Sequence, residues 1–148
     1  MDKESIRRQI QTLKQQLNSA LNERKQMEEQ WDALLEFTAK CEERADAFAE
    51  SIRRRKRKLS GLDALFSRMK AAAAYSQKMN EMLTGEAYQK AKRSIDELMD
   101  ELSSKKNRLR RDLEDIEREI RRLRNRIDDL EDQYNQCLRE EKENDGKD

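Results

Sequence analysis

Met82-Leu83-Thr84-Gly85-Glu86 is the clearest interruption in a sequence that otherwise spaces its apolar residues as helices do. Gly85 can end one helix, Thr84 can cap the next, and Glu86 places a negative charge in its first turn. Long helical patterns lie on both sides of this stretch. We therefore predict that the chain folds back here, so that the two arms cover each other's apolar stripes.

The composition favours long, paired helices. Of the 148 residues, 44% are charged and 34% hydrophobic, and the chain has three glycines and no proline. A disordered chain would typically carry a large net charge, whereas here 33 basic residues nearly balance 32 acidic ones. That balance also argues against a general attraction to nucleic acid or to a membrane surface.

Apolar residues recur in steps of three and four on both sides of the central interruption, which is the seam of a coiled coil or a helical hairpin. We predict an all-α fold, an elongated antiparallel helical hairpin or coiled coil in one domain (1–142). Its arms would span 2–83 and 86–142, and a charged tail (143–148) would be disordered. Ser60-Gly61 is a second candidate break. The seam continues in phase across it, which favours a continuous or kinked helix over a turn.

Charge provides a test of the register. A turn centred on Thr84 places the basic run Arg53–Lys58 opposite the segment from Arg110 to Asp115, which contains three acidic residues. Complementary flanking charges of this kind favour one pairing of two helices over others. In this register the first ~20 residues project beyond the second arm, so that their apolar seam is available to a partner.

No group of residues indicates a reaction or a bound cofactor. The chain has no histidine, its glycines are isolated, and Cys41 and Cys137 are far apart in sequence. We therefore predict a protein that is not an enzyme, with no catalytic, cofactor or metal site. The basic run Arg53–Lys58 lacks the interleaved aromatic residues of a base-stacking surface. It is interpreted as a solvated helix face, with a phosphate-binding patch as the alternative.

No apolar run is long enough to span a membrane, and the N-terminus lacks the apolar core of a cleaved signal peptide. We therefore expect a cytoplasmic protein, or one exported without a cleaved signal.

The Leu83-Thr84-Gly85 stretch, followed by Tyr88 and Ala91, resembles the leucine-x-glycine variant of a tryptophan-x-glycine turn. That turn occurs in small helical proteins of the type VII secretion system of Gram-positive bacteria. The seam from Ile95 to Leu138 is similar to the C-terminal part of the YwqH-like members. Two departures are clear: the turn has no tryptophan, and no tyrosine or phenylalanine is followed four residues later by an acid, as an export signal requires.

The resemblance implies a non-enzymatic adaptor or chaperone. It would bind the helical N-terminal domain of an LXG-type toxin, or another small WXG-like protein, and target the toxin for secretion. The chain would act in the cytoplasm or be exported together with its partner. The residues predicted to bind the partner are Ile6, Ile10, Leu13, Leu17, Met79, Met82, Leu83, Gly85 and Tyr88. The alternatives are a homo-oligomeric coiled-coil scaffold or tether and, third, a nucleic-acid or acidic-surface binder that uses Arg53–Lys58.

Overall fold

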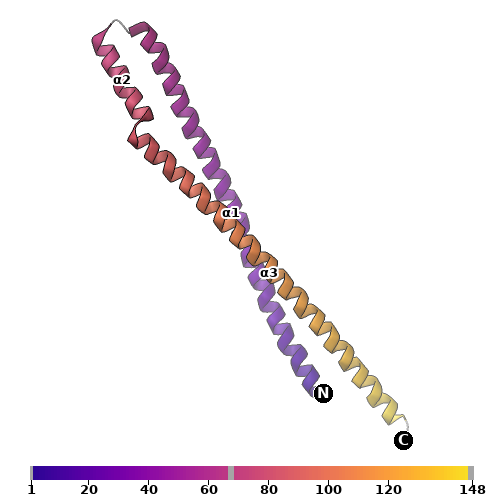
Figure 1. The fold of residues 1–148 in the computed structure, drawn as a ribbon. Coiled ribbons are helices and arrows are strands. Elements are labelled where there is room, and N and C mark those ends of the chain that lie inside the picture. The colour runs from indigo at the N-terminus through magenta and orange to yellow at the C-terminus, as the bar shows by residue number, and fades with distance from the viewer. Residues whose placement is uncertain (1, 67–68, 147–148) are drawn as a thin grey trace. The chain divides into compact units, whose positions relative to one another are not determined.

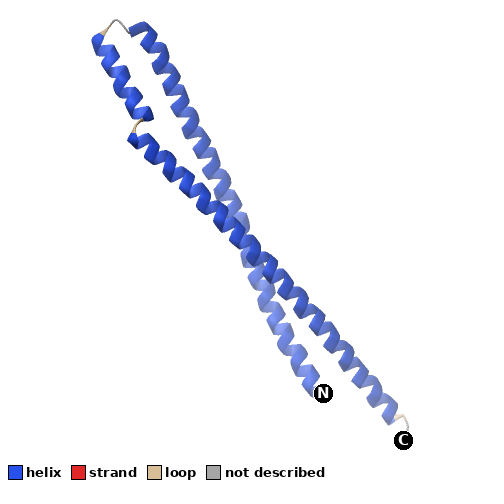
Figure 2. Ribbon diagram, viewed as in Figure 1, coloured by secondary structure: helices blue, strands red, loops and turns tan. Residues whose placement is uncertain are grey.

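The chain is helical almost throughout. A computed structural model describes residues 2–66 and 69–146, although the side chains of residues 62–66 and 72 are outside that description. It contains α1 (Lys3–Phe66), α2 (Lys70–Thr84) and α3 (Glu86–Asp145), and no strand within the described residues (Figures 1 and 2). The predicted all-α helical hairpin is thus confirmed. Of the predicted seam, the side chains of Leu62 and Phe66 fall outside the described residues, as do Lys147 and Asp148 of the predicted tail.

Helix α1 is uninterrupted across its 64 residues. At its start, the backbone N–H of Ser5 donates to the Asp2 carboxylate (2.7 Å), as in a helix N-cap. Ser60 and Gly61 are helical, so the preference for a helix over a turn is confirmed at this position.

The helices form two compact units. Unit 1 comprises Met1–Asp32 and Asn107–Asp148, the first half of α1 and most of α3. Ion pairs join Lys3 to Glu141 and Lys14 to Glu131, each with an Nζ–Oε distance of 3.3 Å. Residue numbers rise along α1 as they fall along α3, so these two helices are antiparallel.

The core of unit 1 is formed by residues of the predicted apolar seam. Ala20, Ile116, Ile120 and Leu123 form a buried cluster, and neighbouring apolar side chains of α1 pack against it, namely Leu13, Leu17, Leu21 and Met27. Ile6 is only 2% exposed. The prediction that the first residues project beyond the second arm with an unpaired seam is therefore wrong.

Unit 2, Ala33–Lys106, contains the second half of α1, the whole of α2 and the start of α3. Helix α1 supplies Ile52 and Leu59 to its core and α2 supplies Leu83, with Phe48, Met79 and Tyr88 packed around them. The rings of Phe48 and Tyr88 are stacked with centroids 6.0 Å apart. Helix α2 and the start of α3 both run antiparallel to α1 in this unit (Figure 1).

The chain direction therefore changes between α1 and α2, and the predicted turn at Thr84-Gly85 is wrong. Leu83 and Tyr88, on either side of Gly85, pack against the same segment of α1. The physical reason is burial. A turn at Thr84 would leave apolar residues near the N-terminus without cover, whereas the observed pairing buries them, and each large apolar side chain that is buried contributes roughly 1.5–3 kcal/mol.

Gly85 instead separates two helices that continue in the same direction. Its backbone is extended (φ −79°, ψ −168°), and a Cβ added there would overlap the carbonyl oxygen of Glu81. Thr84 is the last residue of α2, and its hydroxyl donates to the Asn80 carbonyl (2.6 Å). The prediction that Thr84 caps the following helix is therefore wrong. Only glycine fits this close approach without a shift of the backbone.

Candidate protein interaction site

Exposed apolar side chains identify unit 2 as the candidate interaction site. Six large apolar side chains are exposed among the described residues: Leu35, Phe37, Met69, Tyr75, Met82 and Leu98. All six belong to unit 2. Unit 1 buries or half-buries the large apolar side chains that the structure describes there. Exposed apolar residues that gather in one part of a protein often mark a binding surface.

Two of the most exposed side chains lie on one side of α2. Ser76 and Leu83 are buried and Met79 is half-buried, so these residues mark the direction that faces α1. At about 100° per residue, Tyr75 and Met82 are displaced from that direction by about 70–95° in the same rotational sense. Their side chains are 59% and 68% exposed. They form a lateral stripe rather than part of the core.

A matching stripe runs along α1. Ile52 and Leu59 face α2, and Arg55 and Lys58 are displaced from their mean direction by about 50° and about 110°, in the same rotational sense as Tyr75 and Met82. In two antiparallel helices that face each other, equal rotational displacement places side chains on the same side of the pair. Arg55 and Lys58 therefore border the stripe of Tyr75 and Met82.

The same geometry places two further exposed side chains on this side. Phe37 of α1 and Leu98 of α3 are each displaced by about 60° from the buried direction of their own helix, again in that sense. Leu35 is displaced in the opposite sense. We call this side of unit 2 the lateral face. Its apolar residues are Phe37, Tyr75, Met82 and Leu98, and its cationic residues are Arg55 and Lys58, with Lys78 at its outer margin about 130° from the buried direction of α2.

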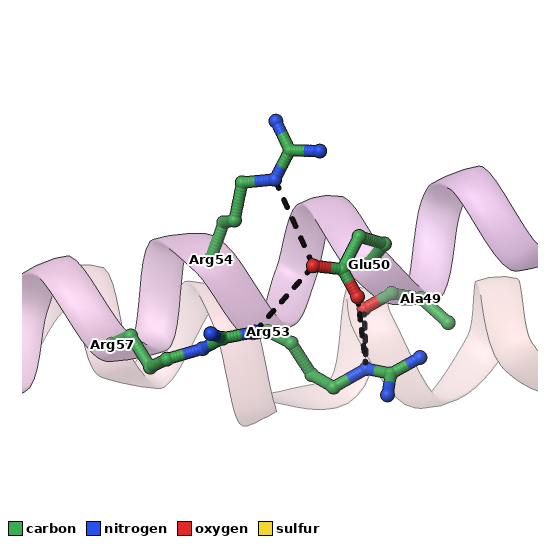
Figure 3. A network of polar contacts seen from close by, with 5 residues as sticks. All are labelled: Ala49, Glu50, Arg53, Arg54 and Arg57. Carbon is green, nitrogen blue, oxygen red and sulfur yellow. Dashed lines mark hydrogen bonds and ion pairs between the residues drawn. The ribbon is translucent and has the colours of Figure 1, made fainter.

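The basic run Arg53–Lys58 is largely unneutralised. Glu50 is the shared partner of three guanidinium groups, at 3.7 Å from Arg53, 3.8 Å from Arg54 and 3.4 Å from Arg57 (Figure 3). The acidic residues expected opposite the run belong to unit 1, whereas the run belongs to unit 2. The predicted pairing with the segment from Arg110 to Asp115 is therefore wrong, because it depended on a turn at Thr84.

Other cations of the run differ in their surroundings. The ammonium of Lys56 lies over the ring of Tyr88, 5.3 Å from its centroid. Arg55 and Lys58 form no ion pair within the described part of the chain. Both line a surface hollow of about 340 Å³ along α1, together with Glu50 and Arg54. The hollow is therefore bordered by three cations and one carboxylate.

The structure separates the predicted partner-binding residues into two sets. Ile6, Ile10, Leu13 and Leu17 belong to unit 1, where they are buried or half-buried. The other five, Met79, Met82, Leu83, Gly85 and Tyr88, belong to unit 2. Of the nine, Met82 is exposed, whereas Leu83 is 4% exposed and lies in the core.

Sequence reasoning missed Phe37, Tyr75 and Leu98 as surface residues. Phe37 is a large apolar residue outside the heptad seam, which is a signal that the sequence does carry. Tyr75 precedes the buried Ser76, and its position became informative only once the direction of α2 was known. Leu98 is on the seam, and its 39% exposure does not follow from periodicity.

Neither a metal centre nor a membrane span is found in the part of the chain that the structure describes. No group of three or more His, Cys, Asp and Glu side chains within 2–66 and 69–146 could hold a metal ion. No helix formed by these residues combines the length and the apolar character needed to cross a bilayer. Cys41 and Cys137 are free and half-buried. Comparison of the sequence with protein-family models and curated proteins, and of the fold with solved structures, gave no match.

Proposed function

We propose that this protein is a non-enzymatic helical adaptor that binds a helix of another protein on the lateral face of unit 2. The observation that carries this proposal is the location of the exposed large apolar side chains, all of which belong to unit 2. Four of them, Phe37, Tyr75, Met82 and Leu98, share one side of the helix pair.

The shape of this face suits a helical partner. Two antiparallel helices present a groove on each side, and a third helix that lies in the groove completes a small bundle. An amphipathic helix recognises such a groove through apolar residues spaced three, four and seven apart. Tyr75 and Met82 are seven residues apart, which matches two turns of a facing helix. Burying half of the surface of a large apolar side chain contributes about 1 kcal/mol, so the four side chains together contribute about 4 kcal/mol, and further contacts must supply the rest of the binding free energy.

The resemblance to type VII secretion proteins suggests which partner this is. We propose the helical N-terminal domain of an LXG-type toxin, with the adaptor acting in the cytoplasm to target the toxin for export, or leaving together with it. The motif behind this finer proposal is Leu83-Thr84-Gly85, in which Leu83 and Thr84 end α2 and Gly85 separates α2 from α3 without reversing the chain. The expected contact at Ile6 to Leu17 is replaced by the lateral face, because that seam packs within unit 1.

The test is a co-purification of the full chain with the N-terminal domain of an LXG-type toxin. Tyr75→Glu combined with Met82→Glu should abolish a one-to-one complex in size-exclusion chromatography with mass measurement. The matched control is Gln77→Glu with Asn80→Glu, since both residues are exposed on the other lateral side of α2. Control and wild type should bind equally.

Equal binding by both double variants would refute the lateral face as the contact. The homo-oligomeric scaffold would be favoured by a different result. In that case the wild-type chain binds no toxin domain and has the mass of a dimer, whereas Tyr75→Glu/Met82→Glu has the mass of a monomer.

A further inference from the structure

Positive charge is concentrated around the junction of α1 and α2. Residues 51–80 include nine Lys and Arg and one Asp, a net charge of +8. Because the whole chain has a net charge of +1, the remaining residues together carry −7. The overall neutrality of the protein therefore conceals a strongly basic segment, and clustered charges of one sign create a local field despite a balanced total.

Three cations of this segment that lack ion pairs lie beside exposed apolar residues. Arg55, Lys58 and Lys78 are on the lateral face with Tyr75 and Met82, and none of the three forms an ion pair within the described residues. In contrast, Arg53, Arg54 and Arg57 all form ion pairs with Glu50 (Figure 3).

We infer that the helix bound on the lateral face is acidic, with Asp or Glu residues flanking its apolar stripe where it meets Arg55, Lys58 and Lys78. This inference rests on the proposed function and specifies the chemistry of the partner. Carboxylates on the flanks of an apolar stripe would meet the three cations while the stripe covers Tyr75 and Met82. Complementary flanking charges fix the orientation of paired helices and raise their association rate.

An acidic helix fits this surface better than an extended polyanion does. A nucleic acid or an anionic membrane surface offers negative charge, whereas the exposed side chains of Tyr75 and Met82 beside the cations require an apolar stripe to cover them. Single-stranded nucleic acids would in addition need aromatic platforms along the cations, whereas Tyr75 is the aromatic residue that the lateral face places beside them. From Phe37 to Lys58 the face extends about 32 Å along α1, which a helix of about 22 residues covers.

The test uses two synthetic helical peptides of this length with identical Leu and Ala positions, one with Glu and the other with Lys at every polar position. Binding to the full-length protein is measured by fluorescence anisotropy at low and physiological salt. The charge variant is Arg55→Glu/Lys58→Glu/Lys78→Glu. Its control is Arg108→Glu/Arg121→Glu/Arg124→Glu, which makes the same change of net charge with exposed residues of unit 1.

We expect the Glu peptide to bind the wild type more tightly than the Lys peptide, with an affinity that falls as salt is added. The charge variant should weaken binding of the Glu peptide about 10-fold or more, and the control less than about 2-fold. Circular dichroism establishes that both variants retain the wild-type helix content.

Three outcomes would overturn the inference. Equal binding of the two peptides, with no effect of the charge variant, would refute the inference that the partner is acidic. The adaptor proposal would still stand if Tyr75→Glu/Met82→Glu abolished this binding. Failure of both peptides to bind would count against the acidic partner and the adaptor together. Tighter binding of a 22-nucleotide single-stranded DNA, or of phosphatidylglycerol vesicles, lost in the charge variant alone, would assign the basic segment to another polyanion.

Discussion

Two glycine-to-alanine substitutions should have opposite effects on stability. Gly61 lies inside α1, and a Cβ added there would meet no atom within 4 Å. Alanine is more favourable than glycine inside a helix by about 1 kcal/mol. Gly61→Ala should therefore stabilise the fold by roughly that amount, which corresponds to an increase of about 2–4 °C in the melting temperature of a chain of this length.

Gly85→Ala should do the reverse. The added Cβ would overlap the Glu81 carbonyl oxygen, and the carbonyl carbon lies 3.3 Å away. Both are backbone atoms, so no side-chain rotation relieves the overlap, and the last turn of α2 must shift. Leu83, 4% exposed, belongs to that turn. We expect a net loss of about 1–3 kcal/mol, which outweighs the unfolded-state gain of about 0.4–1 kcal/mol from removing a glycine.

Thermal unfolding followed by circular dichroism at 222 nm measures both effects. The double variant Gly61→Ala/Gly85→Ala serves as the control, since two independent sites should give additive changes. An increase of the melting temperature in Gly85→Ala, equal to that in Gly61→Ala, would refute the reasoning. It would mean that residue 85 lies inside an ordinary helix and that α2 and α3 are one element.

Four further substitutions test the packing and electrostatics of unit 1 and its contrast with unit 2. Ile120→Ala removes a side chain that is 1% exposed and should cost about 2–4 kcal/mol in urea unfolding, whereas Leu35→Ala, at an exposed position, should cost less than about 1 kcal/mol; equal costs would contradict the assigned cores. Ile6→Asp should abolish hydrogen-exchange protection at the start of α1, because Ile6 is buried there. Unchanged protection would indicate that the N-terminal residues project without a packing partner. The Glu119 carboxylate accepts hydrogen bonds from Arg122 (2.6 and 3.0 Å), and these lower the pKa of Glu119. The pair therefore stabilises the fold at pH values above the unfolded-state pKa of the carboxyl group. This contribution is lost as the pH falls through the lowered pKa. Arg122→Ala should raise the Glu119 pKa in an NMR titration, and an unchanged value would show that the hydrogen bond does not form in solution.

The helical class and the seams follow directly from the sequence. Apolar residues at steps of three and four, together with the absence of proline, admit few alternatives to long paired helices. Ile120, Leu123, Ile127 and Leu130 are seam positions by periodicity, and all four are buried in the structure.

The place where the chain reverses does not follow from local signals. Thr84-Gly85 has the residues of a turn, and the end of α1 has no comparable signal, yet the reversal occurs between α1 and α2. Two arms of nearly equal length bury more apolar surface than two unequal arms, and this global term exceeds the local preference. Periodic seams pair in several registers, so one wrong turn displaced every predicted contact, including the acidic neighbours of Arg53–Lys58.

The lateral face could not be predicted from the sequence for the same reason. Which side of a helix remains exposed depends on where its partner lies, and the partner of α1 around Arg55 is α2 rather than the distant part of α3. Residues at the margin of a seam, such as Tyr75 and Leu98, can be core or surface according to the register. With the register known, their exposure and the adjacent cations follow from helix geometry.

The register of the hairpin can be measured directly by zero-length carbodiimide cross-linking, which joins a lysine to a carboxylate in contact with it. The structure predicts links from Lys14 to Glu131 and from Lys3 to Glu141, both at 3.3 Å. An equal mixture of ¹⁴N- and ¹⁵N-labelled protein, analysed by mass spectrometry, distinguishes links within one chain from links between chains. Recovery of both links within single chains would support the antiparallel pairing of α1 with α3 in unit 1 and would exclude a turn at Thr84. A dominant link from Glu131 to Lys40, as a turn at Thr84 would give, would contradict it.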